Sequence, residues 1–254
     1  MDRNTHIGIF DSGVGGLSVL RALKNELPEE SFIYLADSAN APYGKLQPER
    51  IIDLARKNTE FLLKKNVKLV VLACNTATGI AIKNLRKSFH LPFVGMEPAV
   101  KPAAANSLSR KIGVLATART FEADHFNETV NRFADGVEVF VKVGDGLVEL
   151  IEAGEAGSWQ TEKLLSSYLD PLIDSGIDQL VLGCTHYPFL MPLLRKLLPD
   201  TITIHDPAPA VARQVRRILE KNNGSVKTPK SLEDQYYSTG NRTILDLMLD
   251  TLDD

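Results

Sequence analysis

Residues 68–78, KLVVLACNTAT, contain an apolar segment of strand length that ends at Cys74 and continues into polar residues that favour helix capping. A second stretch, QLVLGCTHYP at residues 179–188, has the same order of apolar run, cysteine and polar turn. Short apolar runs bounded by turn signals are typical of strands buried on both faces, as in a parallel sheet. The two stretches therefore predict two buried strands, each with a cysteine at its carboxyl end.

These stretches are part of a longer internal repeat. Ile7-Gly8-Ile9-Phe10 lies upstream of Cys74, and the similar Ile112-Gly113-Val114-Leu115 lies upstream of Cys184 at a similar separation. Because two matches occur in the same order and at nearly the same spacing, we predict two similar α/β units. The two cysteines then occupy equivalent places in the two units.

Strand-length apolar runs alternate with segments of helical periodicity along the rest of the chain. The predicted strands are Ile7–Phe10, Phe32–Leu35, Lys68–Ala73, Ile112–Leu115, Val137–Val143, Gln179–Gly183 and Thr201–Ile204. The predicted helices are Leu17–Glu26, Pro48–Lys65, Thr78–Phe89, Phe121–Phe133, Gln160–Ser175 and Ala208–Lys221. This alternation predicts an α/β fold in which helices cover parallel sheets.

Two proline-containing segments mark the borders of the second unit. Residues 97–102, EPAVKP, precede it and are interpreted as a crossover between domains. Residues 206–209, DPAP, follow its last predicted strand. The chain beyond them, which includes the segment Gln235–Ser238, exceeds two equal repeats and must dock on one of the two units.

The composition is that of an ordinary globular protein, with 44% hydrophobic and 24% charged residues among 254, and it argues against disorder, collagen and coiled coil. Because 29 Lys and Arg face 32 Asp and Glu, the chain lacks the positive field that binds nucleic acid. The N-terminus shows no signal-peptide core, and the apolar run Leu69–Cys74 is far shorter than the ~20 residues of a membrane span. We therefore expect a cytoplasmic protein without nucleic-acid or membrane partners.

The two cysteines are too few for a disulfide scaffold and lack the paired spacing of a structural zinc site. In parallel α/β sheets, ligands bind beyond the carboxyl ends of the strands, where helix N-termini also point their amides. Cys74 and Cys184 are both predicted there, and a helix N-terminus can make a thiol reactive. A single cysteine is as easily a small core residue. Two cysteines in matched polar turns favour chemistry.

A glycine-rich turn, residues 11–16 (DSGVGG), offers an alternative function as a dinucleotide site. The third glycine of the fingerprint falls at Ser18, while Asp37 stands roughly where a ribose-binding acid is expected. The charge of Asp11 would repel a pyrophosphate, so an NAD-binding oxidoreductase is only the second hypothesis. A tight strand-to-helix turn explains the glycines without any ligand.

Other candidate residues remain open between a functional and a structural role. The loop 37–44, DSANAPYG, could hold a small polar substrate or form only an Asx-type turn with a half-buried tyrosine. His186 could exchange a proton with Cys184, and Glu152 could assist or be a solvated helix residue. A metal site is poorly supported, because His205-Asp206 is only a suggestion of ligands. The chain contains neither a nucleophile elbow nor a P-loop.

Two thiols on matched units suit inversion at a carbon atom. One thiolate can remove a proton from one face of Cα while the opposing thiol donates a proton to the other face. Exchanging the roles of the two thiols runs the reaction backwards. A carboxylate or imidazole near each thiol would adjust its protonation, and we assign this role to Asp11 and His186 as a hypothesis.

Seven successive segments resemble the motifs of one family. They are IGIFDSGVGGLSVL, YLADSANAPYGK, VLACNTATGIA, GMEPAVKPA, IGVLATART, LVLGCTHYPFL and HDPA, which extend to about residue 209. DSANAPYG, ACNTAT and GCTHYP are the most specific, and the set resembles bacterial glutamate racemases of the aspartate/glutamate racemase superfamily. The resemblance implies an isomerase that interconverts L- and D-glutamate without a cofactor or metal and supplies D-glutamate for peptidoglycan synthesis.

The resemblance also assigns residues. Cys74 matches the base for D-glutamate and Cys184 the base for L-glutamate. Asp11 and His186 match the residues that assist the first and second cysteine, and Glu152 matches an acid sometimes given a supporting role. The implied substrate-binding residues are Asp11, Ser12, Pro42, Tyr43, Gly44, Asn75, Thr76, Thr117, Thr120, Thr185 and His186.

The implied architecture is two similar α/β domains with mainly parallel sheets, related by a pseudo-twofold axis, with the active site in the cleft between them. The C-terminal segment returns to the first domain, which gives domains of residues 1–97 with 207–254 and residues 98–206. We further expect a homodimer or a monomer–dimer equilibrium.

The sequence departs from the family at two points: Gly144-Asp145 replaces a common Cys-Pro, and His205 replaces an aliphatic residue. These departures put in doubt the domain interface and the alignment of Glu152. An aspartate or other amino-acid racemase and a non-catalytic glutamate-binding protein remain alternatives.

Overall fold

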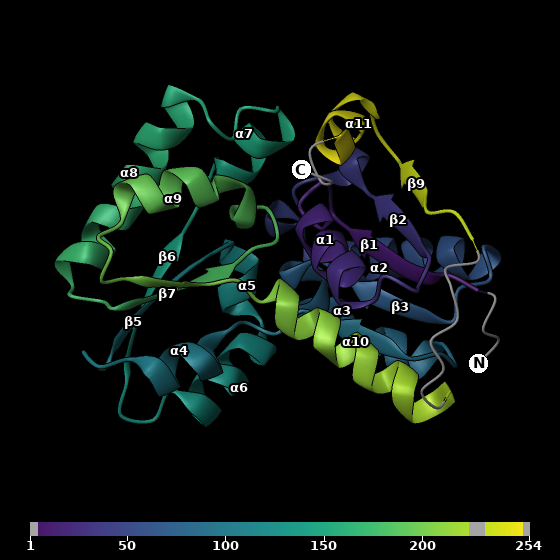
Figure 1. Cartoon of the computed structure of the whole chain (residues 1–254), viewed down its shortest axis with the longest axis horizontal. Helices are drawn as coiled ribbons and strands as arrows, with labels where there is room; N and C mark the ends of the chain where they lie inside the picture. The colour runs from purple at the N-terminus through teal and green to yellow at the C-terminus, as the bar shows by residue number, and fades with distance from the viewer. Residues whose placement is uncertain (1–4, 224–231, 251–254) are drawn as a thin grey trace. The chain divides into compact units, whose positions relative to one another are not determined.

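The computed structural model describes residues 5–223 and 232–250 of the chain (Figure 1). It divides into two compact units, of which unit 1 is Met1–Met96 with Ala208–Asp254 and unit 2 is Glu97–Pro207. Each unit contains one sheet, and every pairing among the described strands is parallel. The predicted α/β class with two parallel-sheet units is confirmed. Residues 1–4, on which the expectation of no signal peptide partly rests, lie outside the described residues.

Unit 1 is built on a five-stranded sheet of order β4-β3-β1-β2-β9. Its strands are β1 (Ile7–Asp11), β2 (Phe32–Ala36), β3 (Leu69–Leu72), β4 (Phe93–Gly95) and β9 (Gln235–Ser238). Its helices are α1 (Leu17–Glu26), η1 (Ser38–Asn40), η2 (Tyr43–Lys45), α2 (Pro48–Lys64), α3 (Asn75–Ser88), α10 (Ala208–Asn223) and α11 (Thr243–Asp250). The C-terminal segment returns to this unit, where α10 packs against α1 and β9 pairs with β2 (Figure 1).

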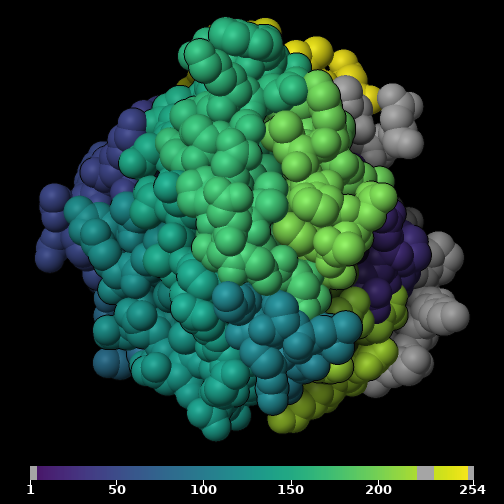
Figure 2. All heavy atoms as spheres, turned by 90° about the vertical axis from the view of Figure 1, so that its left-hand side faces the viewer, coloured from purple at the N-terminus to yellow at the C-terminus, as the bar shows by residue number. Residues whose placement is uncertain are grey.

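Unit 2 is built on a four-stranded sheet of order β6-β5-β7-β8. Its strands are β5 (Lys111–Ala116), β6 (Glu138–Val143), β7 (Gln179–Gly183) and β8 (Thr203–His205). Its helices are α4 (Val100–Asn106), α5 (Ala118–Glu122), α6 (Asp124–Phe133), α7 (Leu147–Glu152), α8 (Trp159–Asp174), η3 (Tyr187–Leu190) and α9 (Met191–Leu197). Figure 2 shows the teal-to-green surface of this unit.

The two sheets repeat one another strand by strand. The order β4-β3-β1-β2 of unit 1 corresponds to β8-β7-β5-β6 of unit 2, with β9 as an addition. The register repeats as well, because Ile7 pairs with Leu69 in unit 1 and Ile112 pairs with Gln179 in unit 2. The internal repeat predicted from the sequence is therefore a repeat of topology and of register.

A glycine on each central strand shows that the packing is also repeated. A Cβ added at Gly8 would approach Val67 and Leu62 to 3.1 and 3.2 Å, and one at Gly113 would lie 2.7 Å from Ile177 and 3.4 Å from Leu172. Leu62 and Leu172 belong to the helices α2 and α8. Each central strand thus has a glycine where the final turn of a covering helix lies against it.

Apart from shifted boundaries, such as the start of α3 at Asn75 and of β8 at Thr203, three details differ from the prediction. The strand β4 was not predicted, because its three residues are too few to show a strand pattern. The predicted crossover 97–102 is partly helical, since α4 begins at Val100. Pro102 fits in the first turn of α4, where a missing N–H costs no hydrogen bond. The predicted helix Phe121–Phe133 is divided into α5 and α6 at Ala123, which has an extended backbone.

None of the helices described for residues 5–223 and 232–250 combines the length and the apolar character needed to span a membrane.

Candidate active site

Cys74 lies between a buried strand and a helix. It follows Ala73 after the end of β3 and is the N-cap of α3. The Ala77 backbone N–H donates a hydrogen bond to Cys74 Sγ over 3.4 Å, and the Thr78 N–H donates to the Cys74 carbonyl over 2.9 Å. The N–H bond and the positive end of the helix dipole both stabilise negative charge on the sulfur. The predicted placement at a helix N-terminus is correct for this cysteine.

Ser12 and Asp11 lie beside Cys74 at the carboxyl end of the neighbouring strand β1. Cys74 Sγ is 3.7 Å from Ser12 Oγ, so the thiol faces a hydroxyl and not only apolar side chains. The fully buried Asp11 carboxylate accepts a hydrogen bond from the Gly16 N–H over 2.8 Å. A Cβ at Gly16 would lie 2.7 Å from Asp11 Cβ and 3.0 Å from Ala73 Cβ, so only glycine fits at the start of α1.

These contacts also explain the glycine-rich turn. The Tyr34 hydroxyl donates to the Gly13 carbonyl over 2.7 Å and fastens the turn to β2. The Gly16 N–H, which a pyrophosphate would need at the start of α1, is already bound to Asp11. The glycines therefore serve a tight strand-to-helix turn, as the structural alternative predicted.

The loop that joins β2 to α2 is held by a buried hydrogen-bond network. The Tyr43 hydroxyl donates to Asp37 Oδ2 over 2.5 Å, and Asn58 Nδ2 donates to the Tyr43 oxygen over 3.1 Å. Tyr43 is fully buried, so the predicted half-buried tyrosine is wrong. Burial, together with the negative charges of Asp37 and Cys74, raises the pKa of Tyr43 far above its ordinary value. Tyr43, which stands between Pro42 and Gly44 in the chain, is therefore a neutral donor bound to Asp37.

Asn75 and Thr76 form the first turn of α3, directly after Cys74, and both are buried. Neither the amide nitrogen nor the carbonyl oxygen of the Asn75 side chain has a hydrogen-bond partner within the described part of the chain. A buried polar group without a partner costs roughly 1–3 kcal/mol and is uncommon unless a ligand or water binds it.

Cys184 lies at the equivalent place in unit 2, after Gly183 at the end of β7. Its Sγ is 3.7 Å from Nδ1 of the buried His186, and Nε2 of the same ring is 2.6 Å from Glu152 Oε1. An ionised carboxylate only accepts hydrogen bonds, so we assign the proton of Nε2 to this bond. Nδ1 is then the nitrogen without a proton, and it faces the Cys184 sulfur.

Cys184 does not cap an α-helix, and the predicted placement at a helix N-terminus is wrong for this cysteine. The chain continues through the short 3-10 helix η3 before α9 begins. At the position equivalent to Thr78 stands Pro188, which has no N–H to donate to the Cys184 carbonyl. The Tyr187 N–H donates to that carbonyl instead, over 3.2 Å, in the tighter 3-10 pattern.

Tyr187 is a buried neighbour of this site that the sequence analysis did not single out. Its hydroxyl donates to the Gly144 carbonyl over 3.3 Å, and a Cβ at Gly144 would overlap that hydroxyl. Burial, followed by the charges of Cys184 and Asp145, raises the pKa of Tyr187 well above its ordinary value. The glycine that departs from the family pattern thus makes room for this tyrosine.

The predicted threonines lie at the same end of the unit 2 sheet as Cys184. Ala116 pairs with Gly183, so Thr117 and Cys184 leave adjacent strands side by side. Thr117 Oγ1 is 2.9 Å from Thr120 Oγ1, and both Thr120 and Thr185 are buried.

His205 takes no part in this arrangement. Its Nε2 lies 2.7 Å from Oε1 of Gln179, at the opposite end of β7 from Cys184. No group of three His, Cys, Asp or Glu side chains that could hold a metal ion occurs among the described residues.

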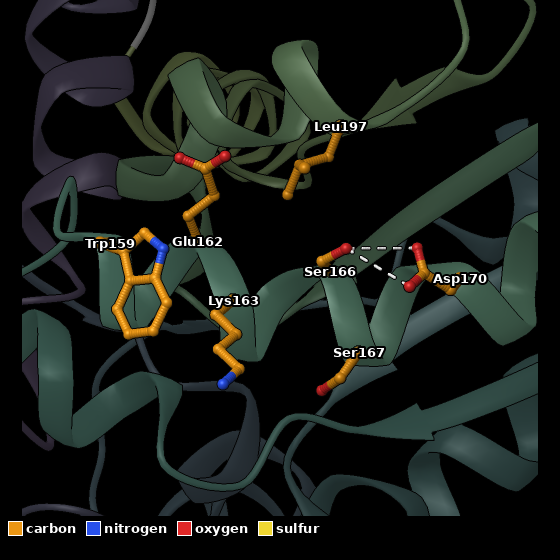
Figure 3. A pocket seen from close by; sticks show the side chains of 7 residues that line it. All are labelled: Trp159, Glu162, Lys163, Ser166, Ser167, Asp170 and Leu197. Atoms are coloured by element: carbon orange, nitrogen blue, oxygen red, sulfur yellow. Dashed lines mark hydrogen bonds between the residues drawn. The ribbon is translucent and has the colours of Figure 1, made fainter.

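A pocket of about 400 Å³ on unit 2 contains none of the predicted residues. It is lined by Trp159, Glu162, Lys163, Ser166, Ser167, Asp170 and Leu197. Figure 3 shows that most of these side chains project from α8, with Leu197 contributed by α9. The pocket has no thiol, so we do not assign catalysis to it.

Comparison with known proteins shows the family to which the chain belongs. A sequence model of the Asp/Glu/Hydantoin racemase family matches residues 7–215. The glutamate racemase of Ectopseudomonas mendocina is 47% identical over 248 residues, which cover 96% of this chain and 94% of that protein. The chain therefore belongs to the Asp/Glu/Hydantoin racemase family and is an isomerase by class.

Two solved structures have the same fold. The Escherichia coli glutamate racemase, solved with L-glutamate and the activator UDP-MurNAc-ala, has a TM-score of 0.86 and 30% identity, over 98% of this chain and 94% of that chain. The Francisella tularensis glutamate racemase, solved with D-glutamate, has a TM-score of 0.82 and 28% identity, over 97% and 94%.

Proposed function

We propose that this protein is a glutamate racemase that inverts Cα of glutamate by proton transfer between Cys74 and Cys184. One observation carries the proposal: two buried thiols stand at equivalent strand ends of a duplicated sheet, and each has polar groups beside it. The relatives named glutamate racemase support glutamate as the substrate. The proposed site requires both thiols to reach one substrate molecule.

In the proposed reaction, each thiol serves one face of the substrate. With D-glutamate, the Cys74 thiolate takes the α-proton and the Cys184 thiol donates its proton to the opposite face, which yields L-glutamate. With L-glutamate the roles are exchanged. Each turnover consumes one thiolate and one thiol and regenerates one of each, so no cofactor or net proton is needed.

His186 and Glu152 are proposed to restore the protonation state of Cys184. Nδ1 of His186 can accept the thiol proton or return it, and the Glu152 carboxylate stabilises the imidazolium that forms. Asp11 is proposed to assist at Cys74 from the end of β1, where its carboxylate is held by the Gly16 N–H.

Substrate binding is proposed to use the polar groups at the two strand ends. The buried Asn75 amide, with no partner in the described chain, is suited to hold a charged end of glutamate. The other proposed contacts are Asp11, Ser12, Pro42, Tyr43, Gly44, Thr76, Thr117, Thr120, Thr185 and His186. Because an α-proton is very weakly acidic, these fixed dipoles must stabilise the carbanion in a site that excludes water.

The cellular role that we propose follows from the product. D-Glutamate would supply peptidoglycan synthesis, and the enzyme would act in the cytoplasm. We also propose a homodimer or a monomer–dimer equilibrium.

The decisive test is solvent exchange. In deuterated water, L-glutamate should gain one deuterium at Cα as D-glutamate appears, and substitution of either cysteine should abolish this conversion. Faster conversion of aspartate would identify a different amino-acid racemase. Saturable binding of glutamate without any change of optical rotation would identify a binding protein instead.

A further inference from the structure

The strand β9 brings the C-terminal segment to the loop that follows β2. Ala36 pairs with Ser238 in parallel register, so Asp37 and Thr239 leave the sheet side by side. The Thr239 N–H continues the pairing by donating to the Ala36 carbonyl over 3.0 Å. The Thr239 side chain is thus delivered to the first residue of the loop 37–44.

The Thr239 hydroxyl uses both its donor and its acceptor capacity on this loop. It donates to Asp37 Oδ1 over 2.6 Å and accepts from the Ala39 N–H over 3.2 Å. The next residue, Gly240, lies so close that an added Cβ would be 3.0 Å from the Ala39 nitrogen and 3.2 Å from the Ser38 carbonyl carbon. The C-terminal segment therefore fits the backbone of the loop closely.

Asp37 links Thr239 to Tyr43 through hydrogen bonds on its two carboxylate oxygens. Its Oδ1 accepts from Thr239 and from Asn40 Nδ2, and its Oδ2 accepts from the Tyr43 hydroxyl and from Asn58 Nδ2. Only 1% of Asp37 is exposed, and a buried carboxylate keeps one orientation when donors occupy both oxygens. Removing the Thr239 hydroxyl leaves Asn40 Nδ2 as the side-chain donor to Oδ1. The Asp37 carboxylate is then held less firmly in one orientation, and so is its hydrogen bond with the Tyr43 hydroxyl.

We infer that Thr239 is a positioning residue for substrate binding: its hydroxyl fixes Asp37, Asp37 fixes Tyr43, and Tyr43 fixes the turn Pro42–Gly44. The inference rests on the proposed function, in which this turn contacts glutamate. Thr239 lies beyond residue 215, where the match to the family ends. A part of the chain outside the matched segment therefore controls the affinity of the site.

The effect of replacing Thr239 on KM distinguishes a positioning role of this residue from a purely structural role. Thr239→Val keeps the side-chain shape and the backbone pairing of β9 but removes the hydroxyl. If the hydroxyl positions the loop, this variant should raise the KM for both enantiomers roughly tenfold, the equivalent of one hydrogen bond to a charged group. It should leave kcat within about twofold, because neither thiol is touched. A purely structural residue would lower Tm and leave KM unchanged.

The experiment uses the full chain and compares four variants with the wild type. Thr239→Ser keeps a hydroxyl and should restore KM to within about twofold of the wild type. Tyr237→Phe is the matched control, because it removes another β9 hydroxyl that contacts Gln235 and Lys65 and not the loop, and it should leave KM unchanged. Gly240→Ala keeps the Thr239 hydroxyl but adds a Cβ close to the Ala39 nitrogen, which should displace the loop from Thr239. This variant should therefore raise KM as Thr239→Val does.

The outcomes separate this inference from the proposed function. A wild-type chain that does not racemise glutamate overturns both. An active wild type overturns the inference alone if Thr239→Val and Gly240→Ala keep the wild-type KM, or if Thr239→Ser has the same defect as Thr239→Val. If Thr239→Val does not fold, the KM of Gly240→Ala, measured against Tyr237→Phe, decides in the same way.

Discussion

Cys74 and Cys184 follow equivalent strands, but the polar groups beside the two thiols differ. Two groups in contact with the Cys74 sulfur in unit 1 do not titrate near neutral pH, namely the Ala77 N–H at the start of α3 and the Ser12 hydroxyl, while the proposed assistant Asp11 lies one residue before Ser12. In unit 2 the Cys184 sulfur faces the imidazole of His186, which in turn contacts Glu152. The duplicated sheet therefore places both sulfurs at equivalent strand ends, while the polar groups beside them differ between the two units.

The two sites also differ in one backbone hydrogen bond. In unit 1 the Thr78 N–H closes the first α-helical turn on the Cys74 carbonyl. In unit 2 the equivalent Pro188 has no N–H, so no α-helix begins at Cys184. Cys184 therefore lacks the amides and dipole of an α-helix start, and in the proposed mechanism His186 and Glu152 supply the compensating charge.

Replacing each cysteine should have the largest effect and tests whether the two sites are one catalytic unit. Cys74→Ala and Cys184→Ala should each slow racemisation by about 10³-fold or more, since each removes an acid–base group. Only Cys74→Ala also removes a helix N-cap, so it should lose about 1 kcal/mol of stability that Cys184→Ala retains. Racemisation near the wild-type rate in either variant would exclude that cysteine from the reaction.

The next largest effect concerns the titratable pair. Glu152→Gln should slow turnover on the order of 10²-fold, because an amide does not stabilise the imidazolium of His186. Proton transfer at Cys184 then limits the rate, so α-deuterated L-glutamate should show a larger isotope effect than α-deuterated D-glutamate. Ser12→Ala, beside Cys74, should show the opposite asymmetry with a smaller loss of rate.

Glu155→Gln is the control for this comparison, because it changes an exposed acid just after α7. It should leave both the rate and the two isotope effects at their wild-type values. Equal isotope effects on the two enantiomers in Glu152→Gln would show that Glu152 does not act through Cys184.

A third comparison concerns the residues that follow β2 and β6, namely Asp37 and Gly144. Asp37 binds the Tyr43 hydroxyl with its side chain, while Gly144 binds the Tyr187 hydroxyl with its backbone. Gly144→Ala should cost about 1–3 kcal/mol of unfolding free energy, because its Cβ overlaps the Tyr187 hydroxyl.

Tyr187→Phe removes that hydroxyl, so the double variant Gly144→Ala/Tyr187→Phe should lose less stability than the sum of the two single variants. Denaturant unfolding of the four proteins measures this coupling. Strict additivity would mean that the added methyl group is accommodated elsewhere.

The smallest effect concerns pH and the strands β4 and β8. His205 occupies the place in β8 that Val94 occupies in β4, and burial lowers the pKa of His205. The unfolded chain therefore takes up this proton at a higher pH than the folded chain. The contribution of His205 to stability is complete above the unfolded pKa of about 6.5 and is lost as the pH falls through the folded value.

His205→Val makes the two strands alike at this position. The fall in Tm between pH 7.5 and pH 5 should be smaller in this variant than in the wild type, whatever constant offset follows from losing the Gln179 contact. An unchanged pH dependence would mean that His205 titrates alike in the folded and unfolded chains.

The sequence by itself determined the duplicated parallel fold and the places of both thiols. An apolar run that ends in a cysteine is a local pattern. It can be read from the sequence because the strand that contains it is buried on both faces. The repeat of Ile7-Gly8 and Ile112-Gly113 was visible for the same reason, because each central strand needs a glycine under a helix. Pro188 is also a local signal, but the sequence analysis did not use it and expected a helix N-terminus at Cys184.

Only the tertiary structure decided which side chains meet. His186 binds Glu152, and Thr239 binds Asp37 across an even longer stretch of chain. These pairs are neighbours because of the order of the strands in each sheet. That order cannot be read from the residue pattern of any single strand. Burial of Tyr43 was decided in the same way, because its hydroxyl can be buried only where Asp37 and Asn58 are both within reach.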